Sequence, residues 1–417
     1  MVSVNACMKR RLCFWGVLMA ITLTVGAQKG VFNRYFTGGT LRVDMVRSGN
    51  SHADTLNVVR FVDRDAAWHG SRTNLIDTLN AGQYRVIMTD KRSGNIIWQH
   101  TYSSLFAEYA HTEVAKSRAE WFEEVLLMPM PKREVVLTFQ RRDAKLVFID
   151  DLVVPFNPRT SSIENRIPLG SVRLLEQHGD PAVKVDVAIV AQGYDTVSEE
   201  QLSIDFYRMR EMLFSYEPFA SRRSDFNLYG VKGNVGAKDG VLGADRYVMT
   251  KDVFRLHDVL ADAPCDYVVI MVNSSKYGGG AVYNFYATTT LHDMADLVLT
   301  HELGHAIGDL ADEYVDEDLS YSDIHLRDVE PVEPNISNLK DFGSKWQSML
   351  PKGTSVPSSM PQPDDRRACG PLGVYEGAGY AQHGVYRPTP HCMMRDYAPF
   401  CPVCRQRMDS MLDKYVK

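Results

Sequence analysis

The chain has 417 residues, of which 45% are hydrophobic and 24% are charged, a composition typical of a folded globular protein and not of extensive disorder. A chain of this length can bury the cores of two or three domains. Acids and bases are scattered along it and give a formal net charge of -6. The sequence therefore predicts neither a nucleic-acid partner nor a basic membrane-binding surface.

Residues 1–27 have the pattern of a signal peptide. A basic segment with Lys9, Arg10 and Arg11 precedes an apolar run that starts at Leu12, and small residues occupy the positions up to Ala27. The apolar run is short for a membrane span, so an uncleaved anchor is the weaker interpretation. We expect cleavage near Ala27 and export to the periplasm, the cell surface or the medium, with no membrane span in the mature chain.

Residues 28–160 predict an N-terminal all-β sandwich. Apolar and polar residues alternate in four segments that are bounded by Gly, Asn and Asp: 40–49, 55–64, 83–102 and 133–156. A hairpin turn is expected at 93–95, where Ser, Gly and Asn follow one another. The histidines of this region are scattered and predict no site of their own.

Residues 161–417 predict an α/β (α+β) domain. The segment 157–171 is rich in Pro, Asn and Ser and is typical of a linker. The segments that follow it have the patterns of a buried strand, a helix with Ser198 as N-cap, and two further strands: 184–194, 198–219, 226–234 and 265–275. Alternation of strands and helices is typical of an α/β fold.

The sequence His301-Glu302-Leu303-Gly304-His305 is an HExxH motif. Histidines four residues apart on a helix lie on one face, so both imidazoles can bind one Zn²⁺, and the intervening Glu302 is placed to act as a general base. The preceding segment 292–300 has apolar residues at helical spacing. The alternative is a coincidental pair of histidines on a solvated helix face.

A catalytic zinc site needs a third protein ligand. On a straight helix Asp312 would share the face of the two histidines but would lie about 10 Å beyond His305 along the axis. The helix must therefore turn near Gly308, which we expect to adopt a left-handed C-cap conformation. Asp312 is the first choice for the third ligand and Glu313 is the alternative, whereas Asp309 is expected to cap the helix or support the site.

Five cysteines remain after the predicted signal peptide: Cys265, Cys369, Cys392, Cys401 and Cys404. In an oxidising compartment we expect the last four to pair as two disulfides and Cys265 to stay a free thiol. The alternative is a structural zinc site in which Cys392, Cys401 and Cys404 are joined by Cys369 or His391.

The stretch 301–314, HELGHAIGDLADEY, resembles the signature of the IgA-peptidase family of zinc metalloendopeptidases, and the cysteine-rich stretch 391–404 resembles a later motif of that family. The resemblance implies an N-terminal β-domain, a metzincin-like catalytic domain and a protein or peptide substrate. It also implies a methionine turn beneath the metal at Met393 or Met394. Ala311 stands where metzincins carry their third ligand, which is a departure from that pattern.

Three further features are weaker. Tyr314, Tyr386 and Tyr397 are candidates to stabilise an oxyanion. The segment 278–290 has the pattern of a glycine loop and a strand that could line the cleft and pair with an extended peptide; the alternative is an ordinary inner strand after a flexible loop. The acidic stretch 314–323 is a candidate for Ca²⁺, against the simpler interpretation as a solvated loop.

Taken together, the sequence predicts an exported zinc-dependent endopeptidase that uses metal-activated water with Glu302 as general base. The alternative is a surface-associated protein that binds glycan or a host protein and carries a structural or vestigial metal site. A zinc hydrolase of non-peptide amide or ester bonds is a third interpretation. The sequence predicts neither a particular substrate nor an oligomeric state.

Overall fold

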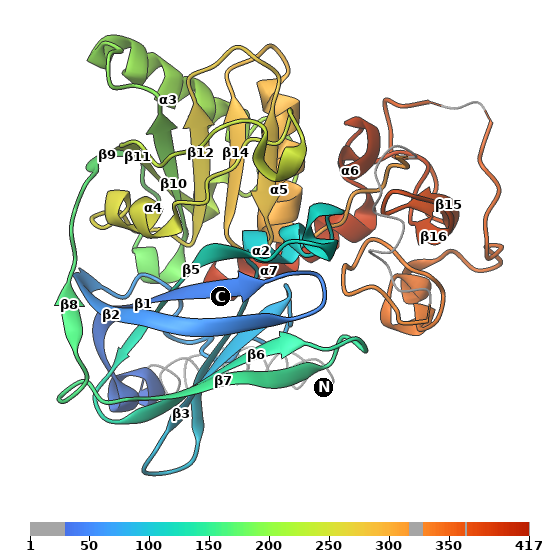
Figure 1. Ribbon diagram of the computed structural model, residues 1–417. Coiled ribbons are helices and arrows are strands. Elements are labelled where there is room, and N and C mark those ends of the chain that lie inside the picture. The colour runs from blue at the N-terminus through green and yellow to red at the C-terminus, as the bar shows by residue number, and fades with distance from the viewer. Residues whose placement is uncertain (1–29, 317–327, 363–364, 417) are drawn as a thin grey trace, which may run out of the picture.

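The computed structural model describes residues 30–316, 328–362 and 365–416. The predicted signal peptide lies outside these residues, as does most of the acidic stretch proposed for Ca²⁺. Figure 1 shows the β-rich N-terminal region below a mixed α/β region, with the C-terminal segment beside them. None of the described helices combines the length and the apolar character that crossing a bilayer requires.

The N-terminal region consists of two four-stranded sheets, in the orders β5-β1-β2-β8 and β4-β3-β6-β7. Their bounds are β1 Phe36–Gly49, β2 Asp54–Ala67, β3 Tyr84–Asp90, β4 Ile96–Tyr102, β5 Glu120–Pro131, β6 Val135–Arg142, β7 Phe148–Phe156 and β8 Ile163–Asn165. Side chains of both sheets share one core, in which Val43 and Met128 of the first meet Val86 and Leu137 of the second. The β-rich sandwich predicted for this region is therefore present, with a short helix, α2 (Leu105–Tyr109), inserted before β5.

The domain boundary differs slightly from the predicted one. Strand β8 pairs in parallel with β2, Ile163 opposite Phe61, so residues past 160 still belong to the N-terminal sheet. The α/β sheet begins with β9 (Ser171–Glu176). A strand of three residues within a polar, proline-containing segment carries too little apolar pattern to be recognised from sequence.

The second region contains a six-stranded sheet in the order β13-β14-β12-β10-β11-β9. The remaining bounds are β10 Val185–Gln192, β11 Phe226–Lys232, β12 Tyr267–Val272, β13 Gly279–Val282 and β14 Tyr286–Thr290. The inner strands pair in parallel, and the edge strands β9 and β13 are antiparallel to their neighbours.

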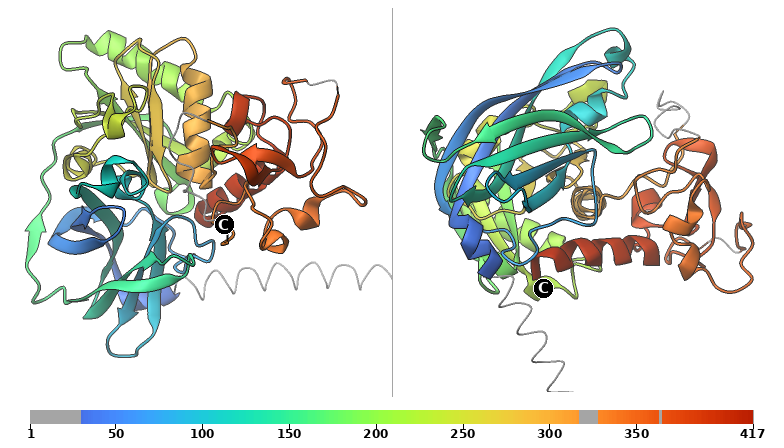
Figure 2. Two further views of the ribbon diagram at one scale, coloured as in Figure 1. Left: turned by 45° about the vertical axis from the view of Figure 1, so that its right-hand side comes forward. Right: turned by 90° about the horizontal axis from the view of Figure 1, so that it is seen from below.

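Both faces of this sheet are covered. Helices α3 (Glu199–Leu213), α5 (Ala295–Gly308) and α7 (Pro402–Val416) pack on the face that Val187 and Ile189 of β10 present. The opposite face, with Ala188 and Val190, packs against α4 (Val253–Val259) and against α2 and β5 of the N-terminal region. Burial on both faces explains why β10 is a continuous apolar run. In Figure 2 α7 is the long red helix of the right-hand view.

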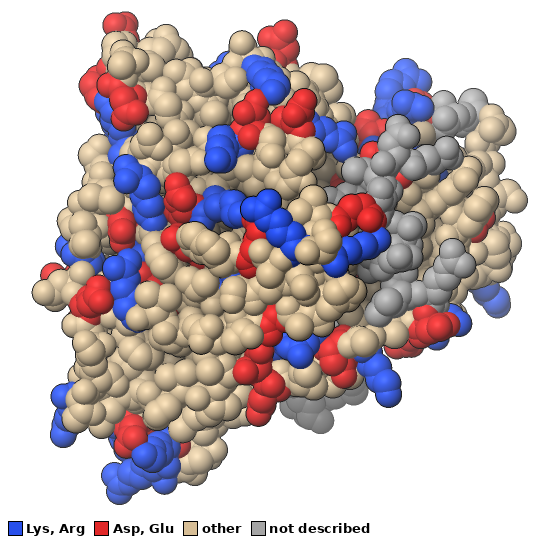
Figure 3. Space-filling view, in the orientation of Figure 1, with Lys and Arg blue, Asp and Glu red and all other residues tan. Residues whose placement is uncertain are grey.

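Buried polar contacts hold the two regions together. Arg42 of β1 forms an ion pair with Asp258 at 2.6 Å, and Lys414 of α7 forms one with Asp77 at 3.0 Å. Arg64 donates to three backbone carbonyls of the segment that follows α4. The N-terminal region is thus packed against the α/β region and not merely tethered to it. Acidic and basic side chains are interspersed over the face shown in Figure 3.

Between α5 and α7 the chain is largely irregular. Among the residues described there, the regular elements are a hairpin of β15 (Tyr375–Ala378) and β16 (Ala381–Arg387), a one-turn helix, α6 (Met393–Asp396), and two short 3-10 helices at Phe342–Ser344 and Gln347–Met349. This segment lies alongside the C-terminal end of α5 (Figure 1).

Buried Asp186 of β10 and the adjacent Asp266, which directly precedes β12, predict a pH-dependent stability. The backbone N–H of Asp186 donates to Asp266 Oδ2 at 2.9 Å, and burial raises the pKa of Asp186 from 3.8 to about 7. A pKa that is higher in the folded state means that stability is lost as the pH rises from the unfolded value through about 7. We expect Asp186→Asn to increase the free energy of unfolding, by up to roughly 4 kcal/mol at pH 8 and by less at pH 5.

Urea unfolding at pH 5 and pH 8 measures this difference. The control is Asp195→Asn, which changes an exposed carboxylate and is expected to have no pH-dependent effect. A gain in the Asp186→Asn protein that is equal at both pH values would contradict the account.

Candidate metal centre

Helix α5 divides its residues between the core and a cleft. The core-facing side chains are Leu299, Leu303, Ala306 and Ile307. His301, Glu302 and His305 line a cleft of about 400 Å³ between the two regions. The i, i+4 spacing thus places both imidazoles on the cleft face, as the sequence predicted, with Glu302 beside them.

Backbone carbonyls orient the two imidazoles. His301 Nδ1 lies 2.9 Å from the carbonyl oxygen of Met393, and His305 Nδ1 lies 2.6 Å from that of Leu310. A carbonyl can only accept, so each Nδ1 carries the hydrogen and each Nε2 presents a lone pair. The two Nε2 atoms lie 3.1 Å apart. This is the outer hydrogen-bond pattern typical of metal-binding histidines.

The chain turns back directly after α5, but not in the way that the sequence suggested. The helix ends at Gly308, and the left-handed residue is Asp309, with φ 54°. The prediction of a left-handed Gly308 is therefore wrong. A Cβ on Gly308 would lie 2.9 Å from the side chain of Leu310 and 3.0 Å from that of Met408, so glycine is required there for space.

Asp309 tolerates the left-handed conformation because its polar groups are satisfied. Its backbone N–H donates to the carbonyl of His305, and its carboxylate accepts from the N–H of Gly82 at 3.1 Å. Aspartate is among the few residues besides glycine that adopt this conformation readily. The supporting role expected for Asp309 is thus a contact that joins the turn to the N-terminal region.

The turn brings Asp312 to the histidines. Asp312 Oδ1 lies 3.0 Å from His301 Nε2 and 3.3 Å from His305 Nε2, while Oδ2 accepts a hydrogen bond from Tyr380. Asp312 is 7% exposed, and its Oδ1 has no hydrogen-bond donor. Three acceptor atoms therefore converge on one point, an arrangement that is repulsive unless a cation lies between them.

The pKa shifts in this histidine–aspartate group (His301, His305 and Asp312) also favour a positive charge between the three side chains. Burial opposes protonation of His305, yet the Asp312 carboxylate outweighs it and raises the pKa of His305 to about 9. Burial opposes ionisation of Asp312, but the two histidines hold its pKa well below the usual range. The group thus favours a positive charge, which either a proton or a metal ion can supply.

The spacing of the three atoms fits a metal ion. Zinc–ligand bonds of about 2.0–2.1 Å at tetrahedral angles separate neighbouring ligand atoms by about 3.3–3.4 Å. The observed separations are 3.0, 3.1 and 3.3 Å. A set of two imidazoles and one carboxylate with an open side toward the cleft is typical of a catalytic zinc site.

The alternative third ligand, Glu313, lies elsewhere. Asn335 holds the segment after the turn by accepting from the N–H of Ala311 at 2.8 Å and donating to its carbonyl at 2.9 Å. Glu313 gathers with Cys392, Cys401 and Cys404 and not with the histidines. Its Oε1 accepts from Asn335 at 2.9 Å, and burial raises the pKa of Glu313 to about 8.

The two predicted Met-turn residues lie beneath α5. Met393 contributes the carbonyl that orients His301, and both methionines are fully buried. A Cβ on Gly304 would lie 2.4 Å from Met394 Sδ, so the glycine within the HExxH motif allows Met394 to approach the helix. The backbone N–H of Glu313 donates to the Met394 carbonyl at 2.7 Å.

The structure separates the tyrosine candidates. Tyr314 and Tyr397 line the cleft, and the hydroxyl of Tyr397 lies 2.8 Å from that of Tyr277. Tyr386, on β16, is not among the residues that line the cleft. Tyr380, which contacts Asp312 from 68 residues away in sequence, was not predicted.

The N-terminal region also contributes to the cleft, which the sequence did not indicate. Glu108 of α2 and the nearby His111 line it, together with Gln83 and Ser103. Edge strand β13 forms part of another wall through Gly279 and Ala281, as expected for the segment 278–290. The backbone of Gly279 is already paired with residues 246–248, so peptide pairing at that position is not available.

The predicted disulfides are absent. All five cysteines in the described residues are free thiols, and Cys392 Sγ and Cys404 Sγ are 3.7 Å apart, far beyond the disulfide length of about 2 Å. Cys392, Cys401 and Cys404 nevertheless gather in one place, where Glu313 joins them. The fourth member is thus a glutamate, and neither Cys369 nor His391.

The contact between Tyr380 and Asp312 predicts an effect on metal affinity. Tyr380→Phe removes the hydrogen bond that orients the carboxylate, and loss of such an outer contact typically weakens metal binding by about 10–100-fold. Competition with a chromophoric chelator measures the zinc affinity of the histidine–aspartate group. Tyr386→Phe, on the same hairpin but outside the cleft, is the control. Equal affinities in both variants and the parent would contradict the assignment.

Comparison with protein families agrees with the geometry. A model described as Peptidase M64 N-terminus matches residues 31–152, and a model described as IgA Peptidase M64 matches residues 173–245, 232–370 and 362–412. A search of curated proteins finds no match. The matches span both regions of the fold and include the histidine–aspartate group. The chain belongs to the IgA Peptidase M64 family.

Proposed function

We propose that this peptidase is a zinc-dependent endopeptidase whose ion is held by His301, His305 and Asp312. Membership of a peptidase family makes the protein a hydrolase of peptide bonds. The observation that carries the choice of site is the convergence of two Nε2 lone pairs and an Asp312 oxygen without a donor, beside Glu302 in the cleft. The binding-protein alternative is not favoured, because a structural metal site has no need of Glu302, which lines the cleft beside the histidines.

Glu302 is the proposed general base. A bound zinc ion would supply a Lewis acid and would lower the pKa of a water molecule in the cleft. The Glu302 carboxylate takes a proton from the attacking water and delivers it to the leaving amine. Burial raises the pKa of Glu302 while the two histidines partly offset this effect, so the carboxylate accepts a proton more readily than an exposed glutamate does.

Tyr397 is the proposed oxyanion stabiliser. It follows α6 in a left-handed conformation with φ 61°, and its ring centroid lies 5.8 Å from that of His301. The contact between its hydroxyl and that of Tyr277 holds the phenol at the cleft. Tyr386 has no comparable position and is not proposed for this role.

The walls of the cleft favour a peptide that contacts both regions. Glu108 and His111 come from the N-terminal region, whereas Arg246 and Tyr247 come from the loop that precedes α4. We propose that the N-terminal region takes part in substrate binding as well as in covering the sheet. Export remains a proposal that rests on the signal-like residues 1–27.

The role of Glu302 predicts a selective loss of activity. Glu302→Gln removes the proton acceptor but keeps the size of the side chain, so we expect kcat to fall by about 10²–10⁴-fold. Zinc content and the thermal unfolding midpoint should match those of the parent. The measurement is hydrolysis of a fluorescently labelled unfolded protein in the presence of zinc.

Glu200→Gln, an exposed glutamate on α3, is the matched control and should leave the rate unchanged. Hydrolysis by the Glu302→Gln protein at the parental rate would exclude Glu302 as general base. A parent protein that binds zinc but cleaves no peptide bond would exclude the proposed activity.

A further inference from the structure

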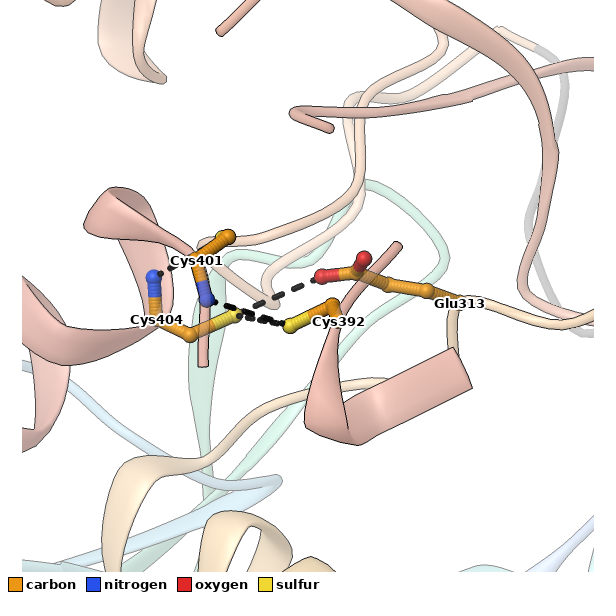
Figure 4. A group of neighbouring side chains, drawn as sticks. All are labelled: Glu313, Cys392, Cys401 and Cys404. Atoms are coloured by element: carbon orange, nitrogen blue, oxygen red, sulfur yellow. Dashed lines mark hydrogen bonds between the residues drawn. The ribbon is translucent and has the colours of Figure 1, made fainter. Parts of the chain in front are cut away.

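A second group of metal-ligating side chains lies next to the histidine–aspartate group in the chain. Glu313, Cys392, Cys401 and Cys404, here called the cysteine–glutamate cluster, have ligand atoms that all lie within 4.8 Å of one another. All four residues are fully buried. Figure 4 shows the carboxylate of Glu313 and the thiols of Cys392 and Cys404 facing one another. We propose that this cluster is a second, structural zinc site.

Two separations within the cluster match those expected around one tetrahedral ion, and all four ligand atoms lie within 4.8 Å of one another. With a zinc–sulfur bond of about 2.3 Å, two sulfur ligands are separated by about 3.8 Å, and a sulfur and an oxygen ligand by about 3.5 Å. Cys392 Sγ and Cys404 Sγ are 3.7 Å apart, and Cys404 Sγ lies 3.3 Å from Glu313 Oε1. Four protein ligands without an open position are typical of structural zinc.

One atom of the cluster lacks a partner. Glu313 is 0% exposed, and its Oε2 has no hydrogen-bond donor. A buried carboxylate oxygen without a partner is costly unless a cation compensates for it. The other oxygen, Oε1, accepts a hydrogen bond from Asn335, which holds the Glu313 side chain toward the sulfur atoms.

Backbone N–H groups are directed at two of the sulfur atoms and would stabilise a negative charge on them. The N–H of Cys401 points to Cys392 Sγ at 3.4 Å, and the N–H of Cys404 points to Cys401 Sγ at 3.5 Å. Cys401 directly precedes α7, so it lies at the positive end of that helix, where thiolates are stabilised. Arg395 donates to the carbonyl of Glu313 at 2.8 Å and brings a positive charge near the cluster.

A disulfide explains the cluster less well. Any disulfide within it would join two cysteines, leave the third unpaired and give the Glu313 carboxylate no role. Soft thiolate ligands favour zinc over calcium or magnesium, which prefer oxygen.

The cluster is joined to the first site by adjacent residues. Glu313 follows Asp312, and Cys392 precedes Met393, whose carbonyl orients His301. An ion in the cluster therefore fixes both segments that position the histidine–aspartate group. We expect loss of the second ion to weaken zinc binding at the first by about 10-fold or more.

Metal content and cobalt spectra of the protein, residues 28–417, test the inference. The parent should bind two zinc ions per chain, and the His301→Ala/His305→Ala protein should retain one. Cobalt added to that double variant should give the intense near-ultraviolet band of thiolate-to-cobalt charge transfer, which the histidine–aspartate group alone cannot give. Because these measurements leave the cysteines intact, they do not depend on whether cysteine variants fold.

Cysteine variants then locate the ligands. In the His301→Ala/His305→Ala background, Cys392→Ser/Cys404→Ser should lose the remaining zinc and the cobalt band. Glu313→Gln in the same background should weaken zinc binding. Cys369→Ser, a partly buried cysteine outside the cluster, is the matched control and should retain both.

The inference would be overturned if the His301→Ala/His305→Ala protein bound no zinc and gave no thiolate–cobalt band. It would also be overturned if the Cys392→Ser/Cys404→Ser protein kept both the zinc and the band. A disulfide found by mass spectrometry within the cluster of the active parent would overturn it as well. Each of them leaves the proposed peptidase activity intact. Conversely, an inactive parent that binds two zinc ions would contradict the proposed function and not the second site.

Discussion

The reversal of the chain at Asp309 is the constraint on which the rest of the site depends. A helix that continued past Gly308 would carry Asp312 away from the histidines by about 1.5 Å per residue. The left-handed Asp309 instead turns the chain back, so that Asp312 lies beside the histidines. Asp312 and Glu313, although adjacent, belong to two different groups of metal-ligating side chains. Their environments separate them further, because the histidines lower the pKa of one while burial raises that of the other.

The reversal is itself held by the N-terminal region. The Asp309 carboxylate accepts from the backbone of Gly82, which precedes β3, and lies 3.6 Å from Arg407 of α7. A change in the packing of the sandwich would therefore reach Asp312, which lies three residues after Asp309 in the chain. The same region covers one face of the catalytic sheet and lines the cleft. These contacts give a physical reason for the two regions to occur together in one chain.

The sequence predicted those features that depend on local spacing. The i, i+4 histidines, the hairpin turn at 93–95, the N-cap at Ser198 and the continuous apolar strand β10 follow from periodicity and turn chemistry, and all are present. The need for a turn near Gly308 followed from the rise per helical residue. The same argument left Asp312, the first choice, and Glu313 both open as the third ligand. The sequence did not predict which residue is left-handed. The side chains that crowd Gly308 belong to Leu310 and to Met408, and Met408 lies on α7, far from Gly308 in the chain.

The sequence did not predict features formed by residues that are far apart in the chain. Tyr380 contacts Asp312 from 68 residues away, and Asn335 holds the neighbouring Ala311 from 24 residues away. Neither residue carries a local sequence pattern. The disulfide prediction rested on the oxidising compartment of an exported chain. Nothing in the sequence indicated that Glu313, 91 residues from Cys404, joins the cysteines in space. The short strand β8 was hidden within a polar segment.

Anomalous diffraction at the zinc absorption edge tests the central claim, the delivery of Asp312 to the histidines by the reversal at Asp309. The account predicts a peak bonded to His301 Nε2, His305 Nε2 and an oxygen of Asp312, with Asp309 in the left-handed conformation. A peak at the histidines whose third protein ligand is Glu313 or another residue, or no peak there in zinc-loaded crystals, would contradict it.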